Sequence, residues 1–170
     1  MGVLDPEQSL ELLAALLPAG WPAAEEPAAA EIAGLLEHIP LALTLAARRA
    51  ERIAARDDDS ARHPLASVLA ELRERRLQVL NQGEDAHRPD LSVVITFDAS
   101  YDDLDPADQA RLRRLGVFAR NEFELPALMA VWGDDEAPAR LALERLVNAG
   151  LLEEAAQDAW RMHDLLREYA

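Results

Sequence analysis

Leu151-Leu152-Glu153 and Trp160-Arg161-Met162 are two short apolar stretches on either side of a polar turn near Gln157-Asp158. This pattern predicts two small strands joined as a hairpin. The residues that follow, His163-Asp164-Leu165-Leu166-Arg167, begin a closing helix. Since the rest of the chain has the apolar spacing of helices, this stretch decides the fold of the C-terminal part.

Four helices are predicted in the second part of the chain, before the hairpin. The first spans about residues 91 to 101, and the second starts at Asp105-Pro106, where an N-cap precedes a proline at the first helical position. The other two start near Pro126 and Pro138, and Gly150 ends the last one. Helices followed by a short hairpin and a closing helix have the layout of a winged helix.

The first part of the chain predicts four helices. They run from Asp5-Pro6 to Leu17, from about Pro27 to Ile39, from about Pro40 to the acidic run Asp57-Asp58-Asp59, and from Pro64 onward. Pro18 and Gly20 are expected to close the first helix. The segment Asn81-Gln82-Gly83-Glu84-Asp85 breaks the helical period and marks a joint. The predicted fold class is mainly α, with a four-helix subdomain over residues 1–84 and a winged-helix subdomain with a short β-hairpin over residues 85–170.

The composition excludes several kinds of site. All 17 basic residues are arginine, so the chain cannot supply the lysine of a P-loop, a Schiff base or a general base. The net charge of -15 opposes binding to the phosphates of nucleic acids. Without cysteine there is no disulfide or thiolate metal site, and no apolar run approaches the roughly 20 residues that span a bilayer. We expect a cytoplasmic protein without a secretory signal, and the wealth of arginine and alanine suggests a GC-rich bacterial genome.

Four segments occur in an order that is typical of one protein family. They are 3–13, Ile39-Pro40-Leu41-Ala42-Leu43, the group formed by 100–104, 115–118 and 128–132, and Met162-His163-Asp164-Leu165-Leu166-Arg167. Read in this order, the chain resembles the helical ARC and winged-helix subdomains of NB-ARC proteins, the STAND class of switch ATPases. The second segment is similar to the GLPLA motif of that family, with Glu37 and His38 where a glycine is usual. The last segment is similar to the MHD motif.

This resemblance implies contacts with a bound nucleotide. Pro40 would pack near the adenine of ADP and His163 would reach its phosphates, while Leu41, Met162 and Asp164 would support these contacts. A histidine suits the task, because one ring nitrogen can donate to a phosphate oxygen while a neighbour orients the other. A P-loop domain upstream in the same, longer protein would hold the ADP or ATP together with its magnesium ion.

The function implied is the regulatory part of an ADP/ATP-dependent conformational switch that holds the inactive state while ADP is bound. Exchange to ATP would release the winged helix. A charged hydrogen bond from His163 to phosphate, worth about 1.5 to 3 kcal/mol, is large enough to shift such an equilibrium about tenfold or more. The chain alone is expected to be monomeric, to bind nucleotide poorly and not to be an enzyme. The resemblance also implies self-assembly of the full-length protein on activation.

Two other functions are alternatives. Winged helices often bind DNA through a recognition helix, which here would be the helix that starts near Pro138. It offers Arg140 and Arg145, but residues 90–170 carry 8 Arg against 17 Asp and Glu, a net charge of -9 that opposes DNA binding. An acidic protein-interaction module fits the charge but leaves the order of the motifs unexplained.

Several residues also have interpretations that need no ligand. By spacing alone Pro40 is a helix-start proline and His163 a structural or solvent-facing histidine. Trp160 and Met162 are predicted to lie in the core. His38, His63 and His87 lack the spacing of paired metal ligands, so each is predicted to be structural or exposed, and no metal site is expected. Three acidic pairs are predicted to be solvated surface rather than a catalytic group: Glu25-Glu26, Asp102-Asp103 and Glu153-Glu154.

Overall fold

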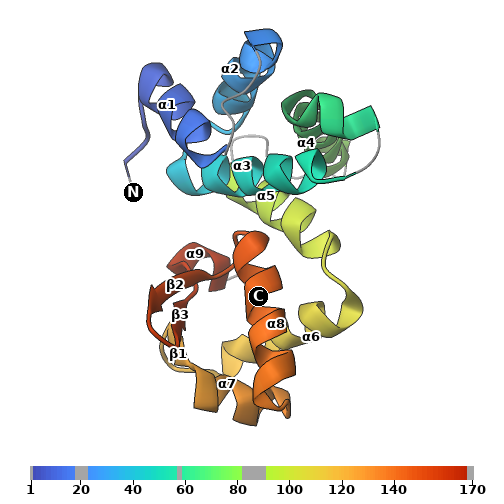
Figure 1. Ribbon diagram of the computed structural model, residues 1–170. Helices are drawn as coiled ribbons and strands as arrows, with labels where there is room; N and C mark the ends of the chain where they lie inside the picture. The colour runs from blue at the N-terminus through green and yellow to red at the C-terminus, as the bar shows by residue number, and fades with distance from the viewer. Residues whose placement is uncertain (1, 18–22, 57–58, 82–90, 168–170) are drawn as a thin grey trace. The chain divides into compact units, whose positions relative to one another are not determined.

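The computed structural model of the chain describes residues 2–17, 23–56, 59–81 and 91–167. Over these ranges the protein is mainly helical with one small antiparallel sheet (Figure 1), which confirms the predicted fold class. The chain divides into two compact units, Met1–Ala99 (unit 1) and Ser100–Ala170 (unit 2). The joint predicted after residue 84 falls within 82–90 and lies outside the described residues. None of the described helices combines the length and the apolar character needed to cross a bilayer.

Three of the described helices of unit 1 begin at a proline. The helices are α1 (Pro6–Leu16), α2 (Glu26–Leu35), α3 (Pro40–Ala54), α4 (Pro64–Asn81) and α5 (Leu91–Asp102, which continues into unit 2), with two short 3-10 turns, η1 (Ala23–Glu25) and η2 (Asp59–Arg62). Pro6, Pro40 and Pro64 each occupy the first helical position, as predicted, because proline's fixed φ suits that position and its missing N–H costs nothing there. Pro18 and Gly20, expected to close α1, lie outside the described residues.

Helix α3 is the centre of unit 1 and lies against α1 and α4. One apolar stripe of α3 is buried, formed by Leu43, Ala46, Ala47, Ala50 and Ile53, whereas Ala54 is exposed. Arg49, also buried, donates to Oε1 of Glu71 on α4 at 2.9 Å and to the carbonyl of Ala99 on α5 at 2.9 Å. A buried guanidinium needs such partners, so Arg49 joins three helices by hydrogen bonds as well as by packing.

Glu25 corrects one prediction, because its carboxylate is buried rather than solvated. The residue is only 2% exposed, and its Oε2 accepts the amide N–H of Leu65 at 2.7 Å. That N–H belongs to the first turn of α4, where helix geometry leaves donors without an intrahelical acceptor. His63, largely exposed, places Nδ1 3.4 Å from the same carboxylate. Glu25 therefore caps α4 from η1, while Glu26, Asp102, Asp103, Glu153 and Glu154 are exposed as predicted.

Unit 2 has the element order of a winged helix. After the end of α5 come α6 (Pro106–Arg114), η3 (Leu115–Val117), β1 (Glu122–Glu124), α7 (Leu125–Trp132), α8 (Glu136–Asn148), β2 (Glu153–Ala156), β3 (Ala159–Arg161) and α9 (Asp164–Arg167). Helix α8 begins two residues before Pro138, since Asp135 is extended and proline is tolerated within a first turn. Its predicted end is confirmed, because Gly150 has φ of 75°, a value that favours glycine.

The sheet of unit 2 has the strand order β1-β3-β2, with both pairs antiparallel. The predicted hairpin corresponds to β2 and β3, but β1 was not predicted. In β1, Phe123 lies opposite Trp160 of β3, and both side chains are buried. Strand β2 starts at Glu153 rather than at the predicted Leu151. The N–H of Leu151 is not available to the sheet, because it donates to the carbonyl of Leu146 at the end of α8, at 3.0 Å.

Candidate functional site

The turn before Pro40 has a backbone that normally calls for glycine. Glu37 and His38 have φ of 55° and 57°, in the left-handed region, which costs a residue with a side chain roughly 1 kcal/mol or more. These two residues end α2 four residues before the predicted end at Ile39 and turn the chain into α3. The turn therefore adopts a left-handed backbone at two residues that both carry side chains. Pro40, which follows the turn and begins α3, is half-buried.

Contacts with α1 and with Leu4, which precedes it, hold this turn in place. The carbonyl of His38 accepts the N–H of Leu4 at 2.9 Å, and its Nδ1 lies 2.9 Å from Oγ of Ser9, which is fully buried. Ser9 also donates to the carbonyl of Asp5 at 2.8 Å. His38 is therefore structural, in agreement with the prediction, and its contacts offset part of the cost of the left-handed backbone. Leu41, the residue after Pro40, is buried.

The His163 ring is oriented by its own local backbone. The residue is half-buried and directly precedes α9, and its Nδ1 accepts the N–H of Leu165 at 3.2 Å. A nitrogen that accepts carries no proton, so the neutral ring carries its proton on Nε2. The side chain thus caps α9 with one nitrogen and keeps the other as a donor. Asp164, the first residue of α9, instead accepts a hydrogen bond from the side chain of Asn121.

The loop 118–121, between η3 and β1, supports the His163 segment from outside the motif. Met162 is buried and donates its N–H to the carbonyl of Asn121 at 2.9 Å. The guanidinium of Arg167 donates to the carbonyl of Phe118 and, at 3.3 Å, to that of Ala119. Residues 162–167 are therefore attached to this loop at both ends.

The predicted site residues form two groups. Met162, His163 and Asp164 lie together in unit 2, and Pro40 and Leu41 lie together at the start of α3 in unit 1. Asn121 and Ser9, which bind residues of these two segments, were not predicted from the sequence. Their contacts join residues that are 43 and 29 positions apart, so no local spacing could have indicated them.

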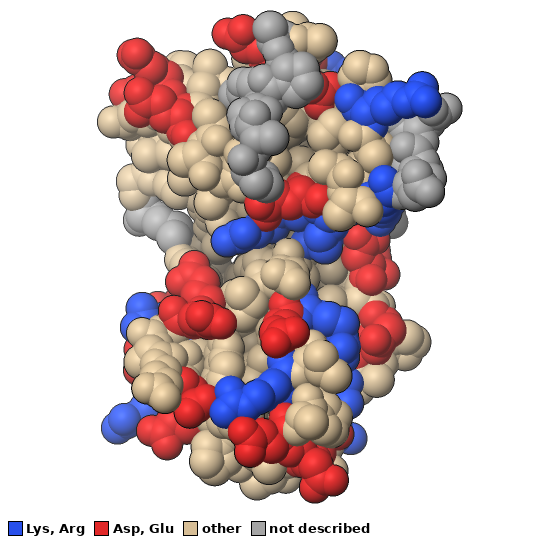
Figure 2. Space-filling model, viewed as in Figure 1, with Lys and Arg blue, Asp and Glu red and all other residues tan. Residues whose placement is uncertain are grey.

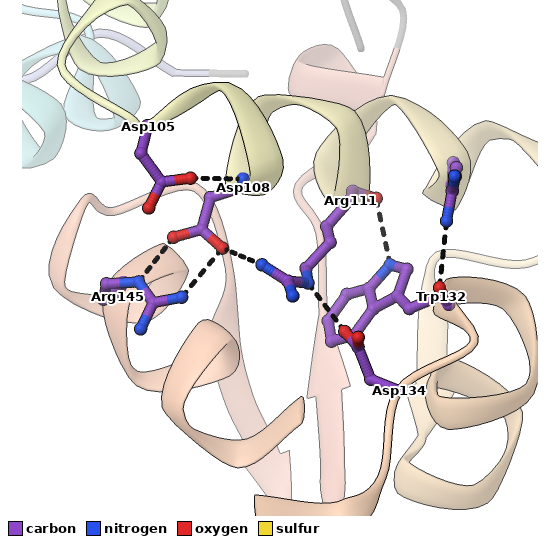
Figure 3. A network of polar contacts seen from close by, with 7 residues as sticks. Asp105, Asp108, Arg111, Trp132, Asp134 and Arg145 are labelled. Atoms are coloured by element: carbon purple, nitrogen blue, oxygen red, sulfur yellow. Dashed lines mark hydrogen bonds and ion pairs between the residues drawn. The ribbon is translucent and has the colours of Figure 1, made fainter. Parts of the chain in front are cut away.

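A buried carboxylate organises the helices of unit 2 (Figure 3). Asp108 of α6 is 1% exposed and accepts hydrogen bonds from Arg145 of α8 and from Arg111 at 2.8 Å. Burial by itself raises the pKa of Asp108, but the hydrogen bonds and charges of Arg145 and Arg111 outweigh it and hold that pKa below its ordinary value. Arg111 also donates to Asp134 at 2.7 Å, and its carbonyl accepts from Nε1 of Trp132 at 3.0 Å.

Both arginines of α8 are engaged within the protein. Arg145 binds Asp108, and Arg140 donates to Glu136 and to Asp158, both at 2.8 Å. These hydrogen bonds raise the pKa of Arg140. On the face drawn in Figure 2, arginine and acidic side chains lie next to one another. Helix α8 would be the recognition helix of a DNA-binding winged helix, and here its cations are already neutralised by carboxylates.

Comparison with characterised proteins relates the whole chain to a segment of two longer ones. Over all 170 residues it is 36% identical to the Regulatory protein AfsR of Streptomyces griseus and 35% identical to that of Streptomyces coelicolor. Both relatives are regulatory proteins. The chain spans 16% of the length of each relative, so the activity of a whole relative cannot be assigned to this chain. No protein-family model matches the chain.

Proposed function

We propose that this chain is the regulatory part of an ADP/ATP-dependent conformational switch of the NB-ARC type. In this proposal Pro40 and His163 contact ADP that is held by a P-loop domain upstream in the same protein, and the contact maintains the inactive state. The observation that carries the proposal is the His163 ring, whose Nδ1 is satisfied by Leu165 so that Nε2 is the donor. The similarity of the whole chain to regulatory proteins agrees with such a role.

The residues present suit a phosphate group. A bound nucleotide supplies negative charge and oxygen acceptors, and His163 offers the N–H of Nε2 as a donor. The cap on Leu165 and the attachment of Met162 to Asn121 fix the ring before any ligand arrives, which reduces the entropic cost of binding. The half-buried Pro40 offers an apolar surface on a turn that Ser9 and Leu4 stabilise.

In the proposed switch, one nucleotide is contacted by a residue of each unit, so its binding is coupled to their arrangement. A ligand shifts an equilibrium only by the difference in its affinity for the two states, and about 1.4 kcal/mol of difference changes their ratio tenfold. A hydrogen bond from His163 to phosphate would exist only in the closed state. Its loss would favour the open state, in which unit 2 no longer contacts the nucleotide.

We also propose that unit 2 does not bind nucleic acid directly. Association with DNA draws its free energy mainly from cations that neutralise phosphates. Arg140 and Arg145, the two arginines of α8, already bind carboxylates, and binding DNA would require breaking these ion pairs.

The test is the rate at which ADP leaves the protein that contains this chain together with its P-loop domain. We expect His163→Ala to accelerate ADP dissociation by about tenfold or more, from the loss of one charged hydrogen bond. His163→Asn separates capping from phosphate binding, because its side-chain oxygen can still accept the N–H of Leu165, while its amide is shorter than the imidazole and leaves no donor at the position of Nε2. Both variants should release ADP faster. Unchanged ADP dissociation in both variants would refute the assignment. Faster dissociation in the alanine variant alone would show that His163 acts as a helix cap and does not bind phosphate.

A further inference from the structure

Asn121 is hydrogen-bonded to the residues on both sides of His163. Its carbonyl accepts the N–H of Met162 at 2.9 Å, and its side-chain amide donates to Oδ1 of Asp164. Asn121 lies outside the motif, in the loop that leads into β1. One residue thus fixes the chain immediately before and immediately after the histidine.

The β-ladder explains why residue 121 reaches this place. Glu122 of β1 lies opposite Arg161 of β3 in the antiparallel register. Moving one residue back along β1 and one forward along β3 brings 121 opposite 162, which is where the next backbone hydrogen bond forms. The side chain of Asn121 then reaches two residues further along the chain, to Asp164.

The chemistry at position 121 calls for an amide. The carboxylate of Asp164 can only accept a hydrogen bond, so its partner must be a donor. Aspartate at position 121 would have the same size as asparagine but would place two carboxylates in contact, and like charges at that distance repel.

We propose that Asn121 is a positioning residue that sets the orientation of the His163 ring for nucleotide binding, which rests on the function proposed above. With Met162 and Asp164 fixed, the backbone between them is fixed, and the Leu165 N–H stays within reach of Nδ1. Nε2 then keeps one direction and one protonation state. Loss of the Asn121 amide frees Asp164 and lets the ring sample other rotamers and the other tautomer.

The first experiment reads the His163 ring directly, by NMR of the ring nitrogens in this chain. In the native chain we expect the tautomer with the proton on Nε2 to dominate. Asn121→Asp should give mixed tautomers at His163, whereas Glu122→Gln should leave the ring unchanged. Glu122 is the matched control, because it is the next residue in the chain and forms an exposed ion pair with Arg161 on the same two strands.

A rescue experiment separates positioning from general damage to the fold. Adding Asp164→Asn to Asn121→Asp restores one amide donor and one carboxylate acceptor with their places exchanged. We expect the double variant to recover the native tautomer. An unchanged ring in Asn121→Asp, or a double variant that does not recover the native tautomer, would overturn the inference.

The second readout is ADP dissociation in the protein that contains the P-loop domain. Asn121→Asp should accelerate it about three- to tenfold, the effect of one hydrogen bond, and the double variant should restore the native rate. A normal ADP rate in Asn121→Asp despite an altered ring would also overturn the positioning role. The proposed function has its own test in His163→Ala, so the two hypotheses can fail separately.

Discussion

Asp108→Ala is expected to destabilise unit 2 by about 3 kcal/mol, because removing one partner of a buried ion pair leaves the other charge without compensation. Asp108 is 1% exposed and binds both Arg111 and Arg145. The expected loss lies at the lower end of the range for buried pairs, since the Arg145 side chain is 47% exposed and can regain water. Because domains are commonly stable by only about 5 to 15 kcal/mol, such a loss leaves unit 2 close to unfolding.

The same carboxylate gives unit 2 a defined acid sensitivity. Its pKa in the folded protein lies below the ordinary value, so Asp108 contributes stability that is fully present above the pKa of the unfolded chain, about 3.9. That contribution is lost as the pH falls through the lower, folded-state pKa. The stability difference between the native protein and Asp108→Ala should therefore shrink below about pH 4.

The measurement is urea unfolding at several pH values, followed by tryptophan fluorescence. Trp132 and Trp160 are both buried in unit 2 and report on its packing. Glu144→Ala is the control, because Glu144 is an exposed acidic residue on α8 and its loss should change stability by no more than about 0.5 kcal/mol. Equal stability of Asp108→Ala and the control at pH 7 would contradict the structural role of the ion-pair network.

Glu25→Ala is expected to destabilise unit 1 by about 2 kcal/mol, because it removes a helix cap and leaves the buried N–H of Leu65 without an acceptor. The neighbouring Glu26→Ala changes the same residue type at an exposed position and should cost only a few tenths of a kcal/mol, roughly the value of an acid in the first turn of a helix.

Amide hydrogen exchange distinguishes these two variants residue by residue. In Glu25→Ala the Leu65 amide should exchange much faster, and thermal unfolding followed by circular dichroism should shift to lower temperature. Glu26→Ala should leave both close to native. Similar behaviour of the two variants would show that the carboxylate of Glu25 does not cap α4.

The sequence predicted helices best where the backbone chemistry is local. Pro6, Pro40, Pro64 and Pro106 each begin a helix as expected, since a proline at the first helical position is favoured by its own φ. The predicted start of α8 at Pro138 was two residues too late, because proline is also tolerated further into the first turn of a helix. The predicted end of α2 at Ile39 was wrong. Glu37 and His38 adopt left-handed backbones, and no glycine in the sequence indicates a turn at these positions.

Features set by distant contacts could not be predicted in the same way. Strand β1 has only three residues and pairs with a strand 35 to 39 positions later, so its own pattern is too short to indicate it. Glu25 and Glu26 were predicted to be a solvated acidic pair. The burial of Glu25 is explained by its hydrogen bond with the N–H of Leu65, which is 40 positions away. For the candidate site, the motifs indicated His163 and Pro40, but the residues that bind their neighbours Asp164 and His38, namely Asn121 and Ser9, became apparent only in the structure.

If this chain belongs to a switch that holds ADP, the longer protein should retain nucleotide through purification, so its nucleotide content should be measured. The protein would be expressed with the residues upstream of this chain, denatured, and the released nucleotide identified by chromatography. We predict about one ADP per protein, as expected for a ligand held by a P-loop domain and retained with the help of Pro40 and His163. Absence of nucleotide, together with an upstream sequence that lacks a glycine-rich loop with lysine, would show that the chain is not part of such a switch.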